Sequence, residues 1–170
     1  MFSPKELASP GYSPLRFACL VSVAPQVLQK KEASLMSFTM MKTDHFAFEV
    51  SDMDKAIRFY TKKLGLKLLS REFDRENQEA YAFLKLDHGS LELLQKFDKN
   101  GRPVKFRKRT PKAPYCPHLA LKTPDMKQLI AKVKKEDIPI AKGPLKAPGL
   151  AKWIYICDPD NNIIEFVQWL

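Results

Sequence analysis

The stretch HFAFEVSDMDKAI, residues 45–57, returns in altered form as HLALKTPDMKQLI, residues 118–130. Each copy opens with a histidine, continues through a short apolar run and then carries an Asp-Met pair. An offset of 73 positions aligns the two stretches, and the same offset aligns Glu92 with Glu165. A constant offset across about fifty residues indicates an internal duplication, so we expect two copies of one structural unit.

Both copies predict the same order of elements. The opening stretch reads as a strand, and the residues after it place apolar side chains at the i, i+3, i+4, i+7 spacing of an amphipathic helix. Strand-like runs follow each helix, at residues 65–73, 79–86 and 90–97 in the first copy and at 138–141, 152–157 and 162–170 in the second. We therefore expect an α+β fold of two tandem β-α-β-β-β modules, with Ser51 capping the first helix and Thr123 beginning the second.

The predicted domain covers residues 41–170, with module one at 41–98, a basic connector at 96–114 and module two at 115–170. Residues 1–40 hold four prolines and many serines without a clear period, so we interpret them as a poorly ordered N-terminal extension. Three cysteines without a CxxC pair argue against a disulfide framework and favour a reducing compartment. We expect a cytoplasmic protein, or one that residues 1–40 direct to an organelle, and the sequence has no apolar run of the roughly 20 residues needed to span a membrane.

The formal net charge of +10 is concentrated in one segment. Residues 96–112 contain eight basic residues and one acidic residue, and so carry +7 of the total. A nucleic-acid reader typically spreads its charge along a helix or sheet face with interleaved aromatic side chains, whereas this run has only Phe97 and Phe106. We expect no nucleic-acid partner and interpret the segment as a solvated connector or an anion clamp.

The duplication preserves a histidine and a glutamate. His45 precedes Glu92 by 47 residues, and His118 precedes Glu165 by the same 47. Each glutamate stands between two apolar residues and so faces away from them. Two imidazoles and two carboxylates without a thiolate suit a borderline divalent ion such as zinc, nickel, cobalt, manganese or iron. A structural histidine beside a solvent-facing glutamate explains one pair alone; the repetition favours a metal site.

The chain resembles the vicinal oxygen chelate superfamily, and bacterial glyoxalase I most closely. The phrases that carry the resemblance are DMDKAIRFYTKKLGLKLL, HLALKTPDM and GPLKAPGLAKWIYICDPDNNIIEFV. The resemblance implies a curved sheet around one divalent ion per site, nickel or zinc first, held by His45, Glu92, His118 and Glu165. It also implies a homodimer with shared sites, and a proton transfer through an enediolate with Glu165 as the first choice of base and Glu92 as the second. Glyoxalase I thereby converts the hemithioacetal of glutathione and methylglyoxal into S-lactoylglutathione, which detoxifies methylglyoxal.

Two positions depart from the glyoxalase I pattern. The arginine expected four residues after the first histidine is Glu49, and the Asn-Trp-Gly-like phrase expected after the first glutamate reads LLQKFDKNG. We therefore expect a small anionic or thiol-conjugate substrate, for which glutathione, bacillithiol and coenzyme A esters remain open. The expected substrate contacts are Glu49, Lys105, Arg107, Arg109 and Lys152.

Other members of the superfamily remain as alternatives. A methylmalonyl-CoA epimerase-like enzyme is one, although such enzymes commonly have glutamine where Glu92 stands. A non-catalytic binding protein of the bleomycin-resistance kind is another, although such proteins lose the metal ligands. Near the expected site, we interpret Cys116 as a buried filler or as a residue that borders the cavity, and residues 142–152 as a mobile flap or an inert connector.

Overall fold

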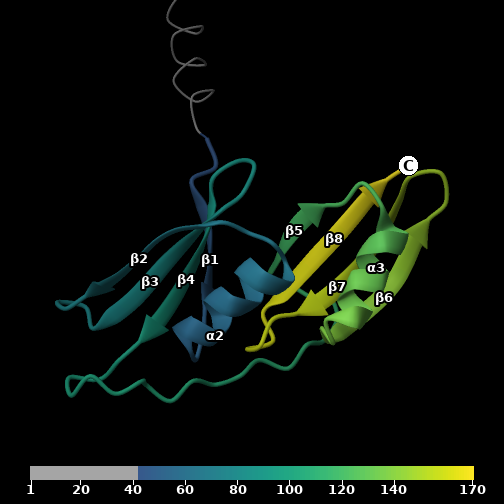
Figure 1. Ribbon diagram of the computed structural model, residues 1–170. Coiled ribbons are helices and arrows are strands. Elements are labelled where there is room, and N and C mark those ends of the chain that lie inside the picture. Colours follow the sequence, from purple (N-terminus) through teal and green to yellow (C-terminus); the bar gives the residue numbers. More distant parts are fainter. Residues whose placement is uncertain (1–41) are drawn as a thin grey trace, which may run out of the picture. The chain divides into compact units, whose positions relative to one another are not determined.

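The computed structural model describes residues 42–170, which contain two four-stranded sheets (Figure 1). The strands of the first sheet, in spatial order, are β1 (His45–Glu49), β4 (Ser90–Lys96), β3 (Glu79–Lys85) and β2 (Leu68–Asp74). β1 runs parallel to β4, and the other neighbours are antiparallel. The predicted extension of residues 1–40 lies outside the described residues and stays a prediction.

The second sheet repeats the first. Its strands, in spatial order, are β5 (His118–Lys122), β8 (Ile163–Trp169), β7 (Ala151–Cys157) and β6 (Ile140–Ala147). β5 is parallel to β8, and the remaining pairs are antiparallel. The prediction of two tandem β-α-β-β-β modules is therefore confirmed.

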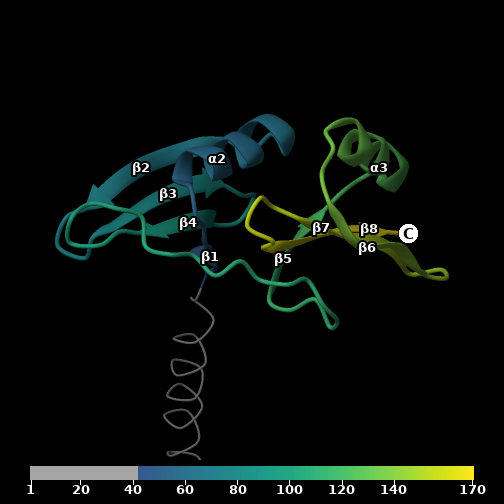
Figure 2. The same ribbon diagram turned by 90° about the horizontal axis from the view of Figure 1, so that it is seen from below.

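Each sheet carries its own helix (Figure 2). The helix α2 (Met53–Arg58) continues as a π-helical turn, η1 (Phe59–Lys63), and packs against β3 and β4, while α3 (Met126–Lys135) packs against β8. Leu91 and Leu93 of β4 are fully buried in the core together with residues of α2. Because side chains alternate along a strand, Glu92 between them points to the face that α2 does not cover.

The expected helix caps are wrong in both modules. Asp52 caps α2 by accepting a hydrogen bond from the Lys55 N–H, and Asp125 caps α3 in the same way. A carboxylate also complements the positive end of the helix dipole, which a hydroxyl does not. Ser51 has a different function, because its N–H and hydroxyl both donate to Asp160.

In each module, one glutamine of the last strand binds the start of the helix, and the two glutamines occupy corresponding positions of the repeat. Gln95 accepts a hydrogen bond from the Met53 N–H at 2.8 Å and donates to the carbonyl of Ser51. Gln168 accepts from the Met126 N–H at 3.0 Å and donates to the carbonyl of Pro124. The duplication has thus preserved a hydrogen-bond network as well as a pattern of apolar residues.

The repeat contains one shift in register. Phe83 pairs with Glu92 and Tyr155 pairs with Glu165, so Phe83 lies nine residues before its glutamate and Tyr155 lies ten. The expectation of one gapless offset is therefore wrong for β3 and β7. The connection between β7 and β8, residues 158–162, is one residue longer than the matching connection at 86–89.

The longer turn, residues 158–162, binds the first module. The Tyr60 hydroxyl donates to Asp158 at 3.0 Å, and Ser51 donates to Asp160. Asn162 donates to the backbone carbonyl of Glu49 at 3.1 Å. Burial raises the pKa of Asp158 and raises that of Tyr60 well above its ordinary value. This turn is a polar joint between the modules.

Residues 142–152, interpreted above as a flap or connector, belong to a hairpin. β6 extends to Ala147 and β7 begins at Ala151, which leaves only residues 148–150 as the turn. The strand accommodates Gly143 and Pro144 because its pairing with β7 shifts register between Lys142 and Leu145. None of the helices described in residues 42–170 is long and apolar enough to cross a membrane.

Candidate functional site

The first His–Glu pair lies on the face of its sheet that α2 leaves open. His45 opens β1 and Glu92 lies in the middle of β4, where its direct neighbour across the parallel strands is Ala47. The His45 Nε2 atom is 3.3 Å from a carboxylate oxygen of Glu92, whose side chain is 15% exposed. The small methyl side chain of Ala47 leaves the space in front of the pair open.

The second pair reproduces the first. Glu165 in β8 has Ala120 as its direct neighbour, and His118 opens β5. The His118 Nε2 atom lies 3.0 Å from a carboxylate oxygen of Glu165, and the Glu165 side chain is 14% exposed. In each module the structure therefore places the predicted histidine next to the predicted glutamate.

The other ring nitrogen of each histidine has its own partner. The Nδ1 atom of His118 lies 2.9 Å from the Tyr115 carbonyl, which only accepts, so this nitrogen is the donor. The Nδ1 atom of His45 lies 2.6 Å from Asp44. The hydrogen bond to Asp44 and the charge of Glu92 raise the pKa of His45 against an opposing effect of burial. Such contacts fix the ring and leave Nε2 for a ligand.

An aromatic side chain packs against each histidine edge to face. The ring centroids of Phe83 and His45 are 5.9 Å apart, and those of Tyr155 and His118 are 5.6 Å apart. Burial and the nearby charge of Glu165 raise the pKa of Tyr155. The sequence did not reveal this correspondence, because Phe83 and Tyr155 are offset by 72 positions and not by 73.

The two pairs do not meet. Within residues 42–170, no three histidine, cysteine, aspartate or glutamate side chains gather closely enough to hold a metal ion. Each module thus presents one imidazole and one carboxylate, two donors of the four that a tetrahedral site requires. A further pair from elsewhere is needed to complete a coordination sphere.

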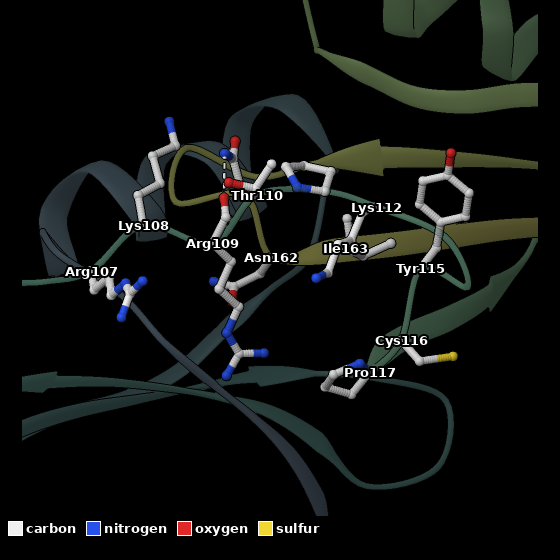
Figure 3. Close-up of a pocket in the computed structure, with 12 residues that line it drawn as sticks. Arg107, Lys108, Arg109, Thr110, Lys112, Tyr115, Cys116, Pro117, Asn162 and Ile163 are labelled. Atoms are coloured by element: carbon white, nitrogen blue, oxygen red, sulfur yellow. Dashed lines mark hydrogen bonds between the residues drawn. The ribbon is translucent and has the colours of Figure 1, made fainter.

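A basic cavity of about 400 Å³ adjoins the second pair (Figure 3). The connector lines it with Arg107, Lys108, Arg109 and Lys112, so we call it the connector cavity, and Asn161 fastens this segment by donating to the Arg109 carbonyl at 2.7 Å. Cys116 is exposed and lines the same cavity, so it borders the cavity and is not a buried filler. Its sulfur lies 3.8 Å from Nδ1 of His118, which places the cavity next to that histidine.

The remaining predicted contacts are dispersed. Glu49 is exposed on β1 and shares the alternation of His45, so both side chains point to the same face. Lys105 is exposed on the connector but is not part of the cavity lining. Lys152 lines a different cavity, beside Gln168 and the start of α3. The structure thus brings together Arg107 and Arg109 but not the two lysines.

Comparison with known proteins identifies the family of the chain. The model of the Glyoxalase/Bleomycin resistance protein/Dioxygenase superfamily matches residues 42–166. The chain belongs to this superfamily. A superfamily relative, the lactoylglutathione lyase of Neisseria meningitidis serogroup A, is 28% identical over 134 residues, which are 75% of this chain and 91% of the relative. A lactoylglutathione lyase of Schizosaccharomyces pombe is 27% identical over 153 residues, and the match covers 80% of this chain but only 50% of the relative's length.

Solved structures extend the comparison. A trypanothione-dependent glyoxalase I of Leishmania major superposes with a TM-score of 0.56 at 26% identity, covering 75% of this chain and 86% of that protein. An antibiotic-binding protein of Streptomyces has a TM-score of 0.55 at 20% identity, covering 77% of this chain and 98% of that protein. At that identity the second comparison shows a shared fold alone.

Proposed function

We propose that the protein is a metal-dependent lyase of the glyoxalase I type, which isomerises a hemithioacetal or a related 2-oxo compound. The observation that carries this proposal is the repeated His–Glu pair, with an imidazole Nε2 facing a largely buried carboxylate in both modules. The lactoylglutathione lyases among the relatives support the same reaction class.

The donor set fits a divalent metal. Nδ1 of His118 donates to a carbonyl, which leaves its Nε2 lone pair free, and Asp44 engages Nδ1 of His45 in the matching position. Two such nitrogens and two carboxylates suit nickel or zinc, and also cobalt, manganese or iron. When bound, the ion would supply Lewis-acid stabilisation of the negative charge that develops on two neighbouring substrate oxygens.

We assign the role of base to Glu165. Ile163, two residues before it on β8, lines the connector cavity, and the neighbour of Glu165 on β7 is Tyr155, whereas the neighbour of Glu92 is Phe83. In our mechanism Glu165 removes the proton from one substrate carbon and returns it to the adjacent carbon, so the substrate is isomerised without net loss of a proton. His45 and His118 serve as ligands, held in orientation through their Nδ1 atoms.

A homodimer completes the site in this proposal. The described chain holds two separate half-sets of donors, and a twofold axis can place the first half-set of one chain against the second half-set of its partner. His45 and Glu92 would then share an ion with the partner's His118 and the partner's Glu165. Each dimer would contain two such sites.

The basic cavity indicates the substrate class. Arg107, Arg109 and Lys112 are exposed there without an ion-pair partner among residues 42–170, so they can bind a carboxylate or phosphate tail. Glu49, on the His45 face, opposes a second carboxylate on the substrate. A thiol conjugate with its anionic groups at one end, such as a bacillithiol or coenzyme A adduct, fits this charge distribution better than glutathione does.

An epimerase acting on a coenzyme A thioester is the second candidate. It uses the same proton transfer next to a carbonyl, and the four basic residues of the connector cavity suit the phosphates of coenzyme A. The assay that separates the candidates supplies nickel or zinc protein with methylglyoxal plus glutathione, bacillithiol or coenzyme A, alongside methylmalonyl-CoA. Turnover of a methylglyoxal adduct supports the lyase, turnover of methylmalonyl-CoA alone supports the epimerase, and inactivity of fully metallated protein on all of them refutes both.

A further inference from the structure

A second basic cavity lies on the helix-bearing side of the protein. It has a volume of about 610 Å³ and is bordered by Lys55 and Arg58 of α2, Lys62 of η1 and Lys108 of the connector. Since α2 covers the face of the first sheet opposite to Glu92, this cavity is separate from the first His–Glu pair. Neither the proposed metal site nor substrate binding in the connector cavity assigns a function to this second cavity.

The basic residues of the helix form a regular stripe. Lys55, Arg58 and Lys62 follow the i, i+3, i+7 spacing, which aligns side chains along one side of a helix. All three are exposed, whereas Ala56 and Tyr60 of the neighbouring stripe are fully buried in the core. The charged stripe is therefore not required for packing α2 on its sheet.

The fourth cation is brought to the cavity by the connector. Asn161 lines the cavity and donates a hydrogen bond to the carbonyl of Arg109, which holds the connector against the turn. In Figure 3 the side chain of Lys108 points the opposite way from that of Arg109. Lys108 lies at the border and lines both cavities, whereas Arg109 lines only the connector cavity.

The nearby negative charges do not neutralise these cations. Asp158 is 1% exposed and already accepts hydrogen bonds from Tyr60 and Asn162. Glu136 accepts a hydrogen bond from Lys63 through its backbone carbonyl, and the carboxylates of Glu136 and the exposed Asp137 also belong to the cavity lining. Within residues 42–170, no ion pair joins Lys55, Arg58, Lys62 or Lys108 to a carboxylate. With Lys63 included, the lining holds five basic residues against three acidic ones, so it keeps an excess of positive charge that a bound anion can neutralise.

We propose that this cavity binds a small phosphorylated molecule of the size of a nucleoside polyphosphate. Its phosphates would contact the four cations, with Arg58 able to form a bidentate contact. Phe59, Pro139 and Pro159 provide apolar lining for the body of the ligand. The volume lies within the range of roughly 300 to 1,000 Å³ that is typical of small-molecule sites. Bound there, the ligand contacts both modules and the connector, so it stabilises the folded chain.

Calorimetric titration of the full-length protein with ATP, pyrophosphate and inorganic phosphate tests the proposal. We expect ATP to bind more tightly than phosphate and to raise the melting temperature. The double substitution Arg58→Glu and Lys62→Glu should weaken ATP binding by about tenfold or more, because two charge-assisted contacts become repulsive. The matched control is the double substitution Lys99→Glu and Arg102→Glu, which makes the same charge change at two exposed residues that line neither basic cavity, and it should change ATP affinity by less than about threefold.

Several outcomes would overturn the proposal. These are no binding of any of the three probes by the parent protein, equal ATP affinity of the parent and the Arg58/Lys62 variant, or loss of ATP binding in the Lys99/Arg102 control alone. Binding of a single-stranded oligonucleotide without binding of ATP would also contradict it. The exposed single variant Lys62→Ala, which should bind ATP more weakly with an unchanged circular dichroism spectrum, separates a binding effect from a folding defect.

Discussion

His118 Nε2 and a carboxylate oxygen of Glu165 lie 3.0 Å apart, and the matching atoms of His45 and Glu92 lie 3.3 Å apart. The same pairing in two modules follows from a duplication, but neither pair alone completes a metal site. The connector and the 158–162 turn join the modules without bringing the two pairs into one cluster in the described chain. In the homodimer that we propose, each half-site would be completed by the other half-site of the partner chain.

The first prediction concerns metal binding. After reconstitution with nickel or zinc, the protein should hold about one ion per chain, and His118→Ala should hold far less because it removes a nitrogen donor. Elemental analysis after gel filtration measures this. His88→Ala is the matched control, since His88 is exposed and has no partner in the repeat. Equal metal content in the parent and His118→Ala proteins would exclude the proposed ligand set.

The second prediction distinguishes shared sites from sites within one chain. Mixing His45→Ala protein with Glu165→Ala protein should restore activity, because one of the two sites in each heterodimer escapes both substitutions. Mixing His45→Ala with Glu92→Ala should restore none, since both changes fall in the first module and damage both sites. If subunit exchange is demonstrated and the two mixtures behave alike, the sites do not form between chains.

The two modules and the two His–Glu pairs could be predicted from the sequence. The offset of 73 aligns His45 with His118 and Glu92 with Glu165, and alternation in β4 and β8 places each glutamate away from its buried neighbours. These features depend on local periodicity, which the sequence records directly. The strand partners of the glutamates depend on the length of the turn that joins the two strands, which differs by one residue between the modules, so Phe83 and Tyr155 could not be matched by the same offset.

Competition between polar groups also limited the prediction. Ser51 has the chemistry of a helix cap, but the structure gives that position to Asp52 and binds Ser51 to Asp160 from the other module. A long-range contact of this kind leaves no local signal. The basic run of the connector was visible in the sequence, whereas its contribution to two cavities, which share Lys108 and Asn161, depends on how the connector packs in the fold.

The third prediction concerns the polar joint between the modules. Tyr60→Phe removes a donor to the buried Asp158 carboxylate and should lower the free energy of unfolding by about 2 kcal/mol at neutral pH. Urea denaturation measures the difference. Tyr115→Phe is the control, because the Tyr115 hydroxyl has no hydrogen-bond partner among residues 42–170 and its loss should cost less than about 0.5 kcal/mol.

The pH dependence of this difference is a separate check. Burial raises the pKa of Asp158 above its ordinary value of 3.8. At a pH between 3.8 and the raised pKa, the folded state therefore binds more protons than the unfolded state. The contribution of Asp158 to stability is therefore greatest at low pH and falls as pH rises through the raised pKa. The Tyr60 hydroxyl offsets part of that cost, so the Tyr60→Phe penalty should grow over the same interval. A penalty that is constant or shrinks with rising pH would show that Tyr60 does not stabilise the charged carboxylate.

The fourth prediction assigns the base. Glu165→Gln should keep the fold and reduce turnover by about 10² to 10⁴, because the amide cannot accept the substrate proton. Glu92→Gln should reduce turnover less at equal metal content, since that glutamate acts as a ligand in our mechanism. Steady-state rates divided by measured metal occupancy provide the comparison. A larger loss for Glu92→Gln would transfer the role of base to Glu92.

The last prediction concerns the choice of thiol. Glu49 is exposed on the same face of β1 as His45, about 13 Å further along the strand at roughly 3.3 Å per residue, so it lies within reach of a bound conjugate. Glu49→Arg replaces a repelling carboxylate with a guanidinium and should increase kcat/KM for the glutathione hemithioacetal, mainly through a lower KM. Glu72→Arg makes the same charge change on the exposed part of β2 and should have little effect, which controls for net charge. Efficient turnover of the glutathione adduct by the unmodified protein, or an equal gain from both substitutions, would show that Glu49 does not select the substrate.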